Sequence, residues 1–296
     1  MNVHVETVEF DSEGARLRGK LFLPDSDAGP LPGVVVAGTW TSVKEQMADR
    51  YARRLAEHGL AALSFDFTGY GESEGEPRET EIPEKKIADI RSALTFLVGH
   101  GSVDRERIGA LGICAAAMYM SASAAADSRI RSLALVAPWL HDAAICAEVY
   151  GGEAGVQEKL AIGREAREIY ERTGQVEYVP VVSSTDPRAA MPFDIDFYLN
   201  PQRGGIPEWG NRFALMAWPS WLTFDSVALA PKIEVPTLLV HSEDAAIPDG
   251  ARRFHAGLTG PRQFVWTTGT QFDIYDQEPN VTFAVKAAAA HLLKTL

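Results

Sequence analysis

The sequence constrains its own fold most strongly at residues 107–120, RIGALGICAAAMYM. An apolar run at 108–113 ends at Cys114, two small residues (Gly112 and Ala116) stand two positions before and after it, and a helix-forming run follows at once. Where a buried strand turns sharply into a helix, the apex backbone is strained, and bulky side chains two positions away would collide. The stretch therefore predicts a nucleophile elbow with Cys114 at its apex.

Buried strands alternate with helices on both sides of this stretch. Continuous apolar runs, typical of strands buried on both faces, occur at 31–38, 60–67, 131–138 and 235–241, and another strand is expected at 263–267. The spacing of apolar residues predicts helices at 43–58, 82–98, 250–258 and 279–294, besides the helix that runs from the elbow to about residue 126. A hairpin of half-exposed strands at 3–10 and 15–23 comes first. This alternation predicts an α/β fold, with a mostly parallel sheet covered by helices on both faces.

The alternation stops after Trp139. Residues 139–228 include a predicted helix at 157–173 but no buried-strand run, and they hold four of the six tryptophans. The strand pattern then resumes. We therefore expect an α/β core made of residues 1–138 and 229–296, with residues 139–228 inserted as a largely helical cap.

Composition excludes several classes of partner. The 296 residues carry a formal net charge of −12, which disfavours binding to nucleic acid or to an anionic membrane surface. Two cysteines make no disulfide framework, and we see no signal peptide and no membrane span, so we expect a cytoplasmic location with both thiols free. The expected partner is a small molecule, with no cofactor and no metal. The oligomeric state is open, and a homodimer is one of the alternatives.

A nucleophile on an elbow needs an oxyanion site and an acid that orients its base. The oxyanion donors would be the backbone N–H of Ala115 and an N–H of the loop at 39–41, where Trp40 is the candidate; the alternative is that Trp40 only packs. The candidate acid is Asp244, which follows the strand at 235–241. The alternative for Asp244 is an ordinary acidic residue at a helix N-terminus.

The general base is where the sequence departs from this arrangement. In the loop after the last strand, Gln271 stands where a histidine is expected, and an amide cannot take up a proton near neutral pH. His141 and His241 each follow the carboxyl end of a core strand, on the same edge of the sheet as Cys114. They are therefore the alternative bases, and solvated or structural histidines are the other interpretation.

A cysteine needs less help from a base than a serine does. A thiol has a pKa of about 8.5 when unperturbed, and a helix N-terminus lowers it by favouring the thiolate. We therefore expect some Cys114 thiolate even without a histidine. The alternative is a buried, inert thiol, since free cysteine is among the most buried residue types.

These residues resemble the α/β-hydrolase superfamily, and more narrowly its dienelactone-hydrolase-like branch, which includes polyketide transferases of secondary metabolism. The matching segments are VVVAGTWTSVKEQ (34–46), LSFDFTGYGESEGEPR (63–78), DRERIGALGICAAAMYM (104–120), LLVHSEDAAIP (238–248) and GTQFDIYD (269–276). The resemblance implies an eight-stranded sheet and a nucleophile–acid–histidine triad that acts on esters, lactones, thioesters or amides. Cys114 and Asp244 match the pattern, whereas Gln271 replaces its histidine.

Three functions fit this sequence. The first is hydrolysis or acyl transfer through Cys114, with Asp244 and Gln271 holding water or substrate. The second is a non-hydrolytic cyclase, lyase or isomerase that uses the oxyanion donors alone. The third is a binding protein that has lost its chemistry.

The aromatic residues suggest a substrate class. Trp139, Trp218 and Trp221 from the insertion and Phe272 from the core are expected to line the pocket. Such a lining favours an ester, lactone or thioester of a medium-sized, largely apolar metabolite. The alternative is that these rings only join the cap to the core.

Overall fold

Eight strands form the central sheet, with β5 among its inner strands, and β7 and β8 form a separate two-stranded sheet. A computed structural model describes residues 2–25 and 29–296, in which eight strands pair in the order β1-β2-β4-β3-β5-β6-β9-β10. Only β2 runs antiparallel to its neighbours, β1 and β4. The strands are β1 (Val3–Ser12), β2 (Ala15–Pro24), β3 (Leu31–Ala37), β4 (Ala61–Phe65), β5 (Val103–Ile113), β6 (Ile130–Val136), β9 (Thr237–Ser242) and β10 (Arg262–Thr267). The predicted mostly parallel, eight-stranded sheet is confirmed.

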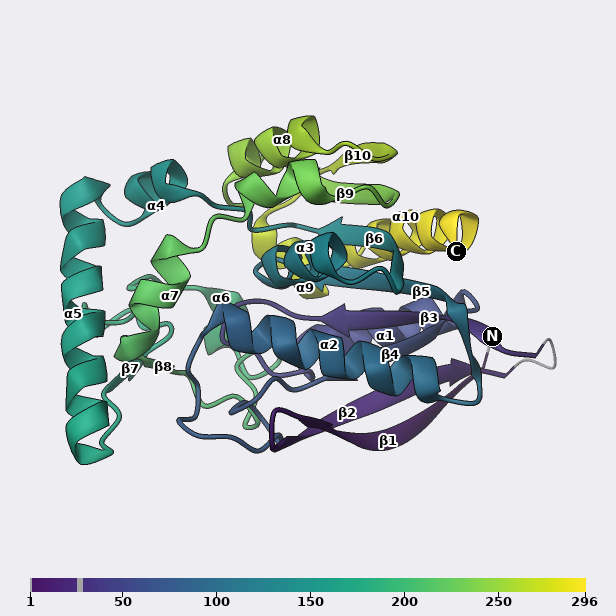
Figure 1. Ribbon diagram of the computed structural model, residues 1–296. Coiled ribbons are helices and arrows are strands. Elements are labelled where there is room, and N and C mark those ends of the chain that lie inside the picture. The colour runs from purple at the N-terminus through teal and green to yellow at the C-terminus, as the bar shows by residue number, and fades with distance from the viewer. Residues whose placement is uncertain (1, 26–28) are drawn as a thin grey trace.

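Helices cover both faces of this sheet, as predicted. On one face α2 packs against α3, and on the other α1 packs against α10 (Figure 1). The helices of the core are α1 (Ala48–Glu57), α2 (Pro83–Gly99), α3 (Ala116–Ala126), α8 (Pro248–Gly257), α9 (Gln271–Asp276) and α10 (Asn280–Thr295).

The predicted helix at 43–58 begins only at Ala48. The preceding backbone donors are bound by side chains instead: the Val43 N–H donates to the side-chain oxygen of Gln46 (3.1 Å), and the Lys44 N–H donates to the carboxylate of Asp66 (2.8 Å). These bonds hold turns where the apolar spacing alone predicts helix. Apolar spacing does not register such competition from side chains.

Residues 139–228, which we call the cap segment, lie beyond the carboxyl ends of the parallel strands (Figure 1). They contain α4 (Ala143–Val149), α5 (Gly152–Thr173), β7 (Tyr178–Pro180), α6 (Asp196–Leu199), β8 (Arg212–Ala214) and α7 (Trp218–Thr223), with a 3₁₀ turn at 215–217. A second 3₁₀ turn, at 227–232, crosses the boundary to the core. The predicted helix at 157–173 is the larger part of α5. Across both described ranges, no helix is long and apolar enough to cross a membrane.

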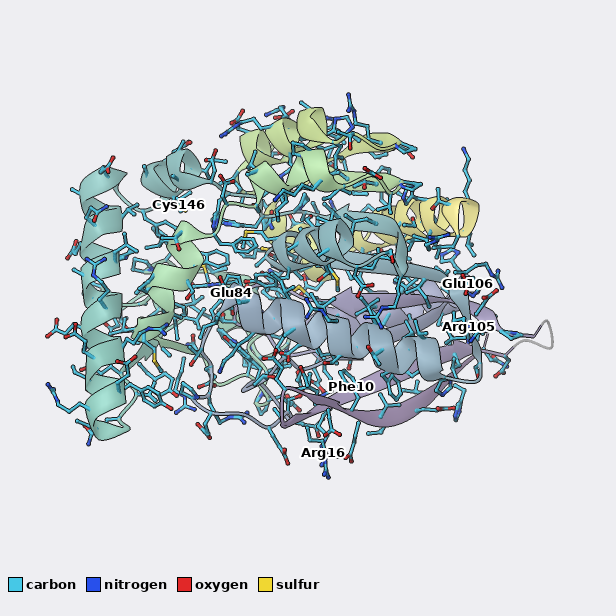
Figure 2. The ribbon with its side chains drawn as sticks, viewed as in Figure 1. Phe10, Arg16, Glu84, Arg105, Glu106 and Cys146 are labelled. Carbon is cyan, nitrogen blue, oxygen red and sulfur yellow. The ribbon has the colours of Figure 1, made fainter. Side chains whose placement is uncertain are left out.

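The two cysteines occupy different layers of the molecule. Cys114 directly follows β5, and Cys146 lies on α4 in the cap segment (Figure 2). Both are buried and free. Only Cys114 lies at the carboxyl end of the sheet where β5 turns into α3.

Candidate active site

The turn between β5 and α3 has the backbone that an elbow requires. Cys114 has a φ of 55°, in the left-handed region that residues with a side chain rarely adopt. Gly112 allows the turn to close, because a Cβ there would lie 2.6 Å from the carbonyl oxygen of Ala116. The Cys114 N–H donates to the Val136 carbonyl (3.0 Å), which fixes the apex against β6. The sequence of small residues around Cys114 is thus explained by the closeness of strand and helix.

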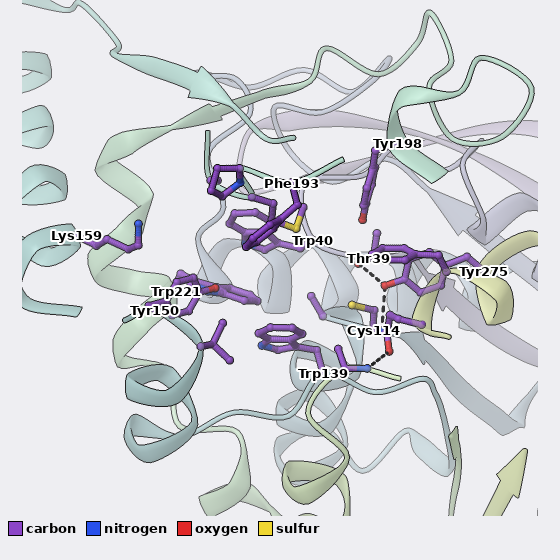
Figure 3. Close-up of a pocket in the computed structure, with 18 residues that line it drawn as sticks. Thr39, Trp40, Cys114, Trp139, Tyr150, Lys159, Phe193, Tyr198, Trp221 and Tyr275 are labelled. Carbon is purple, nitrogen blue, oxygen red and sulfur yellow. Dashed lines mark hydrogen bonds between the residues drawn. The ribbon is translucent and has the colours of Figure 1, made fainter. Parts of the chain in front are cut away.

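A cavity of about 370 Å³ opens above Cys114 between the core and the cap segment (Figure 3). Its core side is formed by Thr39, Trp40, Cys114, Ala115, Ala246, Gln271, Phe272 and Tyr275. Its cap side is formed by Trp139, Val149, Tyr150, Lys159, Ala190, Met191, Pro192, Phe193, Tyr198 and Trp221. The lining is mainly apolar and aromatic, which is the usual character of a small-molecule site.

Three of the four expected pocket residues line this cavity, namely Trp139, Trp221 and Phe272. Trp218 does not. Its ring is buried behind the wall, with ring centroids 4.7 Å from Phe213 and 6.0 Å from Trp40. Trp218 and Trp221 are three residues apart on α7 and both pack against Trp40, yet only Trp221 reaches the cavity, a difference that spacing alone does not show.

The two residues expected to supply oxyanion donors, Trp40 and Ala115, both line the cavity together with Cys114. The loop is turned by Thr41, which has a φ of 55° and whose N–H donates to the Glu81 carboxylate (2.9 Å). The Trp40 ring itself packs against Trp221, with centroids 5.3 Å apart. Trp40 therefore packs through its ring and also belongs to the cavity lining.

Glu81 is the centre of a buried group that the sequence analysis missed. Its carboxylate accepts from Lys86 Nζ (2.7 Å), the Tyr70 hydroxyl (2.9 Å) and the Tyr119 hydroxyl (2.5 Å), as well as from Thr41. Glu81 and Lys86 are both fully buried, and burial lowers the pKa of Lys86 while Glu81 opposes that shift. We call Thr41, Tyr70, Glu81, Lys86 and Tyr119 the charged cluster. It ties the oxyanion loop to α3, yet none of its members lines the cavity.

Gln271 begins α9 rather than lying in a loop. The Thr270 hydroxyl accepts the Asp273 N–H and caps this six-residue helix. The Gln271 side-chain oxygen accepts the Ala246 N–H (3.1 Å), and its nitrogen donates to the Ala137 carbonyl (2.8 Å). That nitrogen also donates to the Tyr275 hydroxyl (3.1 Å; Figure 3). The amide is thereby held in one orientation, with both ends bonded.

Tyr275 is the second group that the sequence analysis missed. It lies one helical turn after Gln271, and its hydroxyl is 3.3 Å from the Thr39 hydroxyl. The hydroxyl of Tyr275 also lies close enough to the Cys114 thiol that each group shifts the pKa of the other. We call Thr39, Cys114, Gln271 and Tyr275 the neutral cluster. The signal in the sequence is the four-residue spacing from Gln271 to Tyr275, which has meaning only once the segment is known to be helical.

The surroundings of the sulfur do not favour the expected Cys114 thiolate. Burial raises the pKa of the Cys114 thiol, and hydrogen bonds from Thr39, Tyr275, Gln271 and the Ala115 N–H offset only part of that effect. The thiol is buried, so the loss of hydration outweighs these hydrogen bonds. At neutral pH the resting cysteine is therefore a thiol.

Asp244 does not reach Gln271. Its side chain is exposed and does not line the cavity, and its backbone N–H donates to the Ser242 hydroxyl (3.2 Å). The oxygen of Gln271 instead accepts the backbone N–H of Ala246, two residues further along the same loop. The loop after β9 is thus at the site, but its acid points away.

Neither alternative histidine lines the cavity. His141 is buried, where its Nδ1 accepts from Trp139 Nε1 (2.8 Å) and its Nε2 lies 3.0 Å from the Trp221 carbonyl. His241 Nε2 lies 3.2 Å from the Ala246 carbonyl. Burial lowers the pKa of each to about 4. Both are structural histidines, because their ring nitrogens are turned into the protein rather than toward the sulfur.

Comparison with known proteins gives the fold a family. Residues 31–276 match the alpha/beta hydrolase family. The chain is 27% identical over 289 residues to the uncharacterised protein PA2218 of Pseudomonas aeruginosa, covering 91% of this chain and 75% of that protein. The crystal structure of PA2218 superposes with a TM-score of 0.85, over 99% of this chain and 94% of that one.

Two fungal relatives carry functional names. A thiohydrolase of Eupenicillium brefeldianum is 26% identical over 274 residues, covering 87% of this chain and 83% of that protein. The polyketide transferase grgF of a Penicillium species is 31% identical over 132 residues, 44% of each chain. The crystal structure of the α/β hydrolase GrgF superposes with a TM-score of 0.83 at 21% identity, over 99% of both chains. From the match across its core and the sheet topology, this chain belongs to the alpha/beta hydrolase family.

Proposed function

We propose that the protein transfers the acyl group of a thioester through an acyl-Cys114 intermediate to an acceptor other than water. The observation that carries this proposal is a thiol on an elbow, at the base of an apolar cavity that holds no general base. The lining residues in the described ranges include no histidine, aspartate or glutamate. A nucleophile is present, but a group that activates water is not.

Thiol–thioester exchange suits such a site because it releases no net proton. The Cys114 sulfur bonds to the carbonyl carbon, the bond from that carbon to the departing sulfur breaks, and the thiol proton ends on the departing sulfur. One thioester replaces another, so the step requires no strong driving force. The N–H groups of Ala115 and Trp40 would stabilise the negative charge that develops on the carbonyl oxygen.

The second half-reaction decides between transfer and hydrolysis. A hydroxyl, amine or thiol of the acceptor attacks the acyl-cysteine, and its proton returns to the Cys114 sulfur. Water is a poor competitor because a positioned general base ordinarily contributes about 10²- to 10⁴-fold, and the bonded amide of Gln271 contributes none of it. An apolar cavity also favours an apolar acyl chain over water. The relatives named polyketide transferase and thiohydrolase support thioester chemistry.

The proposal is tested by trapping the intermediate. The protein is mixed with the octanoyl thioester of N-acetylcysteamine, and its intact mass is followed. We expect one octanoyl group on the wild type and none on Cys114→Ala. Cys146→Ala is the matched control and should still be acylated, because burial raises the pKa of Cys146 to about 12 and it lies outside the cavity. A folded wild type that never gains the octanoyl mass would contradict the proposal.

The raised pKa of Cys114 favours a second candidate, a non-hydrolytic enzyme that makes no covalent bond. The oxyanion donors would then stabilise an enolate-like charge during a cyclisation, elimination or isomerisation. This candidate predicts that Cys114→Ala retains turnover of the substrate. The acyl-enzyme proposal predicts that the same variant loses it.

A further inference from the structure

We propose that Lys159 binds a carboxylate at the far end of the acyl chain, so that the enzyme prefers acyl groups with an acid at both ends. Lys159 is half-buried on α5 and lines the cavity. Figure 3 shows its side chain at one end of the site and Cys114 at the other, with Trp40, Trp139 and Trp221 between them. The direction of the bound chain rests on the proposed function, which places the reacting carbonyl at Cys114.

The ammonium group of Lys159 is held without a counter-ion. Its Nζ lies 4.8 Å from the ring centroid of Trp218 and 5.9 Å from that of Tyr150. Such cation–π contacts fix a cation in place but leave its charge uncompensated. Of the ion pairs found across residues 2–25 and 29–296, none involves Lys159, in a chain that has twelve more acidic than basic side chains.

The helix around Lys159 supplies no acid either. The positions three and four residues away on α5, where a partner would lie, are Gly155, Val156, Ile162 and Gly163. Lys159 is also the only charged side chain among the described residues that line the cavity. An anionic ligand that enters the cavity therefore meets one cation, and that cation has no competing partner.

The number and spacing of polar groups select the class of ligand. A single ammonium matches a carboxylate, whereas a phosphate usually requires several donors or an arginine, and the lining has no arginine. The aromatic stretch between Lys159 and Cys114 requires an apolar middle section. The ligand chemistry that fits is an ω-carboxylated acyl thioester, with the thioester at Cys114 and the free acid at Lys159.

Substrate selectivity tests this inference. The probes are the N-acetylcysteamine monothioester of octanedioic acid and the matching octanoyl thioester, and the readout is the ratio of their kcat/KM values. We expect the wild type to favour the carboxylate probe, and Lys159→Met to lower the ratio about 10- to 100-fold, the usual range for a lost hydrogen bond between charged groups. Lys159→Arg should keep most of the preference. Arg164→Met, an exposed cation on the same helix, should leave the ratio unchanged.

Binding to the Cys114→Ala protein separates this inference from the proposed function. Titration calorimetry with the same two probes reports binding without acyl transfer. Preference for the carboxylate probe that disappears in Cys114→Ala/Lys159→Met supports the Lys159 subsite, even if the wild type never forms an acyl-enzyme. Equal binding of the two probes, or a preference that survives loss of the lysine, overturns it.

Discussion

Two buried polar clusters meet at the elbow, and they differ in charge and in position. The charged cluster contains the ion pair between Glu81 and Lys86. It hydrogen-bonds both the loop at 39–41 and α3, yet it lies outside the cavity. The neutral cluster contains the Cys114 thiol with Gln271, Tyr275 and Thr39, and it lines the cavity. The protein thus places full charges where they hold the loop at 39–41 and keeps neutral groups around the Cys114 sulfur.

The difference follows from what each cluster must do. A buried ion pair with all of its hydrogen bonds satisfied fixes geometry, but it is costly to disturb. Under the proposed function, the groups beside the Cys114 sulfur would exchange solvent for an apolar part of the substrate, and a fixed charge at that end of the cavity, away from Lys159, would resist the exchange. A histidine–acid pair beside Cys114 would bring such a charge into the cavity during turnover. The neutral cluster avoids it.

The largest effect should come from removing the charge of Glu81. Glu81→Gln leaves the Lys86 ammonium buried without its counter-ion, and breaking such a pair typically costs about 3–5 kcal/mol in free energy of unfolding. Urea unfolding measures this loss. We also expect slower acylation of Cys114, because Thr41 loses its charged acceptor and the oxyanion loop loosens.

Two variants control for this result. Glu84→Gln removes an exposed carboxylate near the start of α2, the helix that carries Lys86 (Figure 2). It should change the unfolding free energy by less than about 0.5 kcal/mol. Glu81→Gln/Lys86→Met removes both charges and should recover part of the loss. Equal stability of the Glu81→Gln and Glu84→Gln proteins would show that the charged cluster does not hold the loop.

The next effect concerns the neutral cluster. Gln271→His places a base next to Cys114, where it can activate water, and we expect hydrolysis of the acyl-cysteine to rise about 10²-fold, the lower end for general-base catalysis. The release of octanoate from the octanoyl thioester measures it. Gln271→Asn is the matched control and should give no gain, since it is also an amide. If the histidine variant hydrolyses no faster, the missing base is not what limits hydrolysis.

The pattern of neighbouring residues predicted those parts of the site that depend on the backbone, namely the strands and the elbow. The Val-rich run at 31–38 forms β3, and the small residues around Cys114 form the elbow. A buried strand requires apolar residues along its length, and a closely approaching helix requires small residues, so both can be predicted from neighbouring positions. The direction of a loop side chain imposes no such requirement on the residues next to it. Asp244 follows its strand as expected but points into solvent.

The histidines and Tyr275 also show that the sequence pattern does not predict where a side chain points. His141 and His241 lie at the predicted edge of the sheet, yet their ring nitrogens face protein groups from distant segments or the adjoining loop. Tyr275 reaches the sulfur only because Thr270 caps a short helix that turns it inward. Which side chains converge on Cys114 is decided by tertiary contacts, and periodicity along the chain does not contain that information.

A smaller effect is expected from the hydroxyl of Tyr275. Tyr275→Phe removes a hydrogen bond that favours the Cys114 thiolate, so the pKa of the thiol rises further. Less thiolate is then present at any pH below that pKa, and alkylation by iodoacetamide should slow about tenfold and shift its pH profile upward. Tyr198→Phe removes another hydroxyl from the same cavity and should slow alkylation less. Equal rates for the wild type and Tyr275→Phe would remove this residue from the neutral cluster.

The smallest effect is expected from substituting Asp244. This variant tests whether a charged side chain acts on the neutral cluster. Asp244→Asn should change the acylation rate by less than about twofold, because an exposed side chain with no contact to Gln271 contributes little. The same substitution in the Gln271→His protein is more informative, since a histidine needs an acid to orient it. If Asp244→Asn lowers hydrolysis only in that background, the loop after β9 still turns its acid inward when a base is present. If it slows acylation in the wild-type background as well, a charge already acts at the sulfur, and the division between a charged and a neutral cluster does not hold.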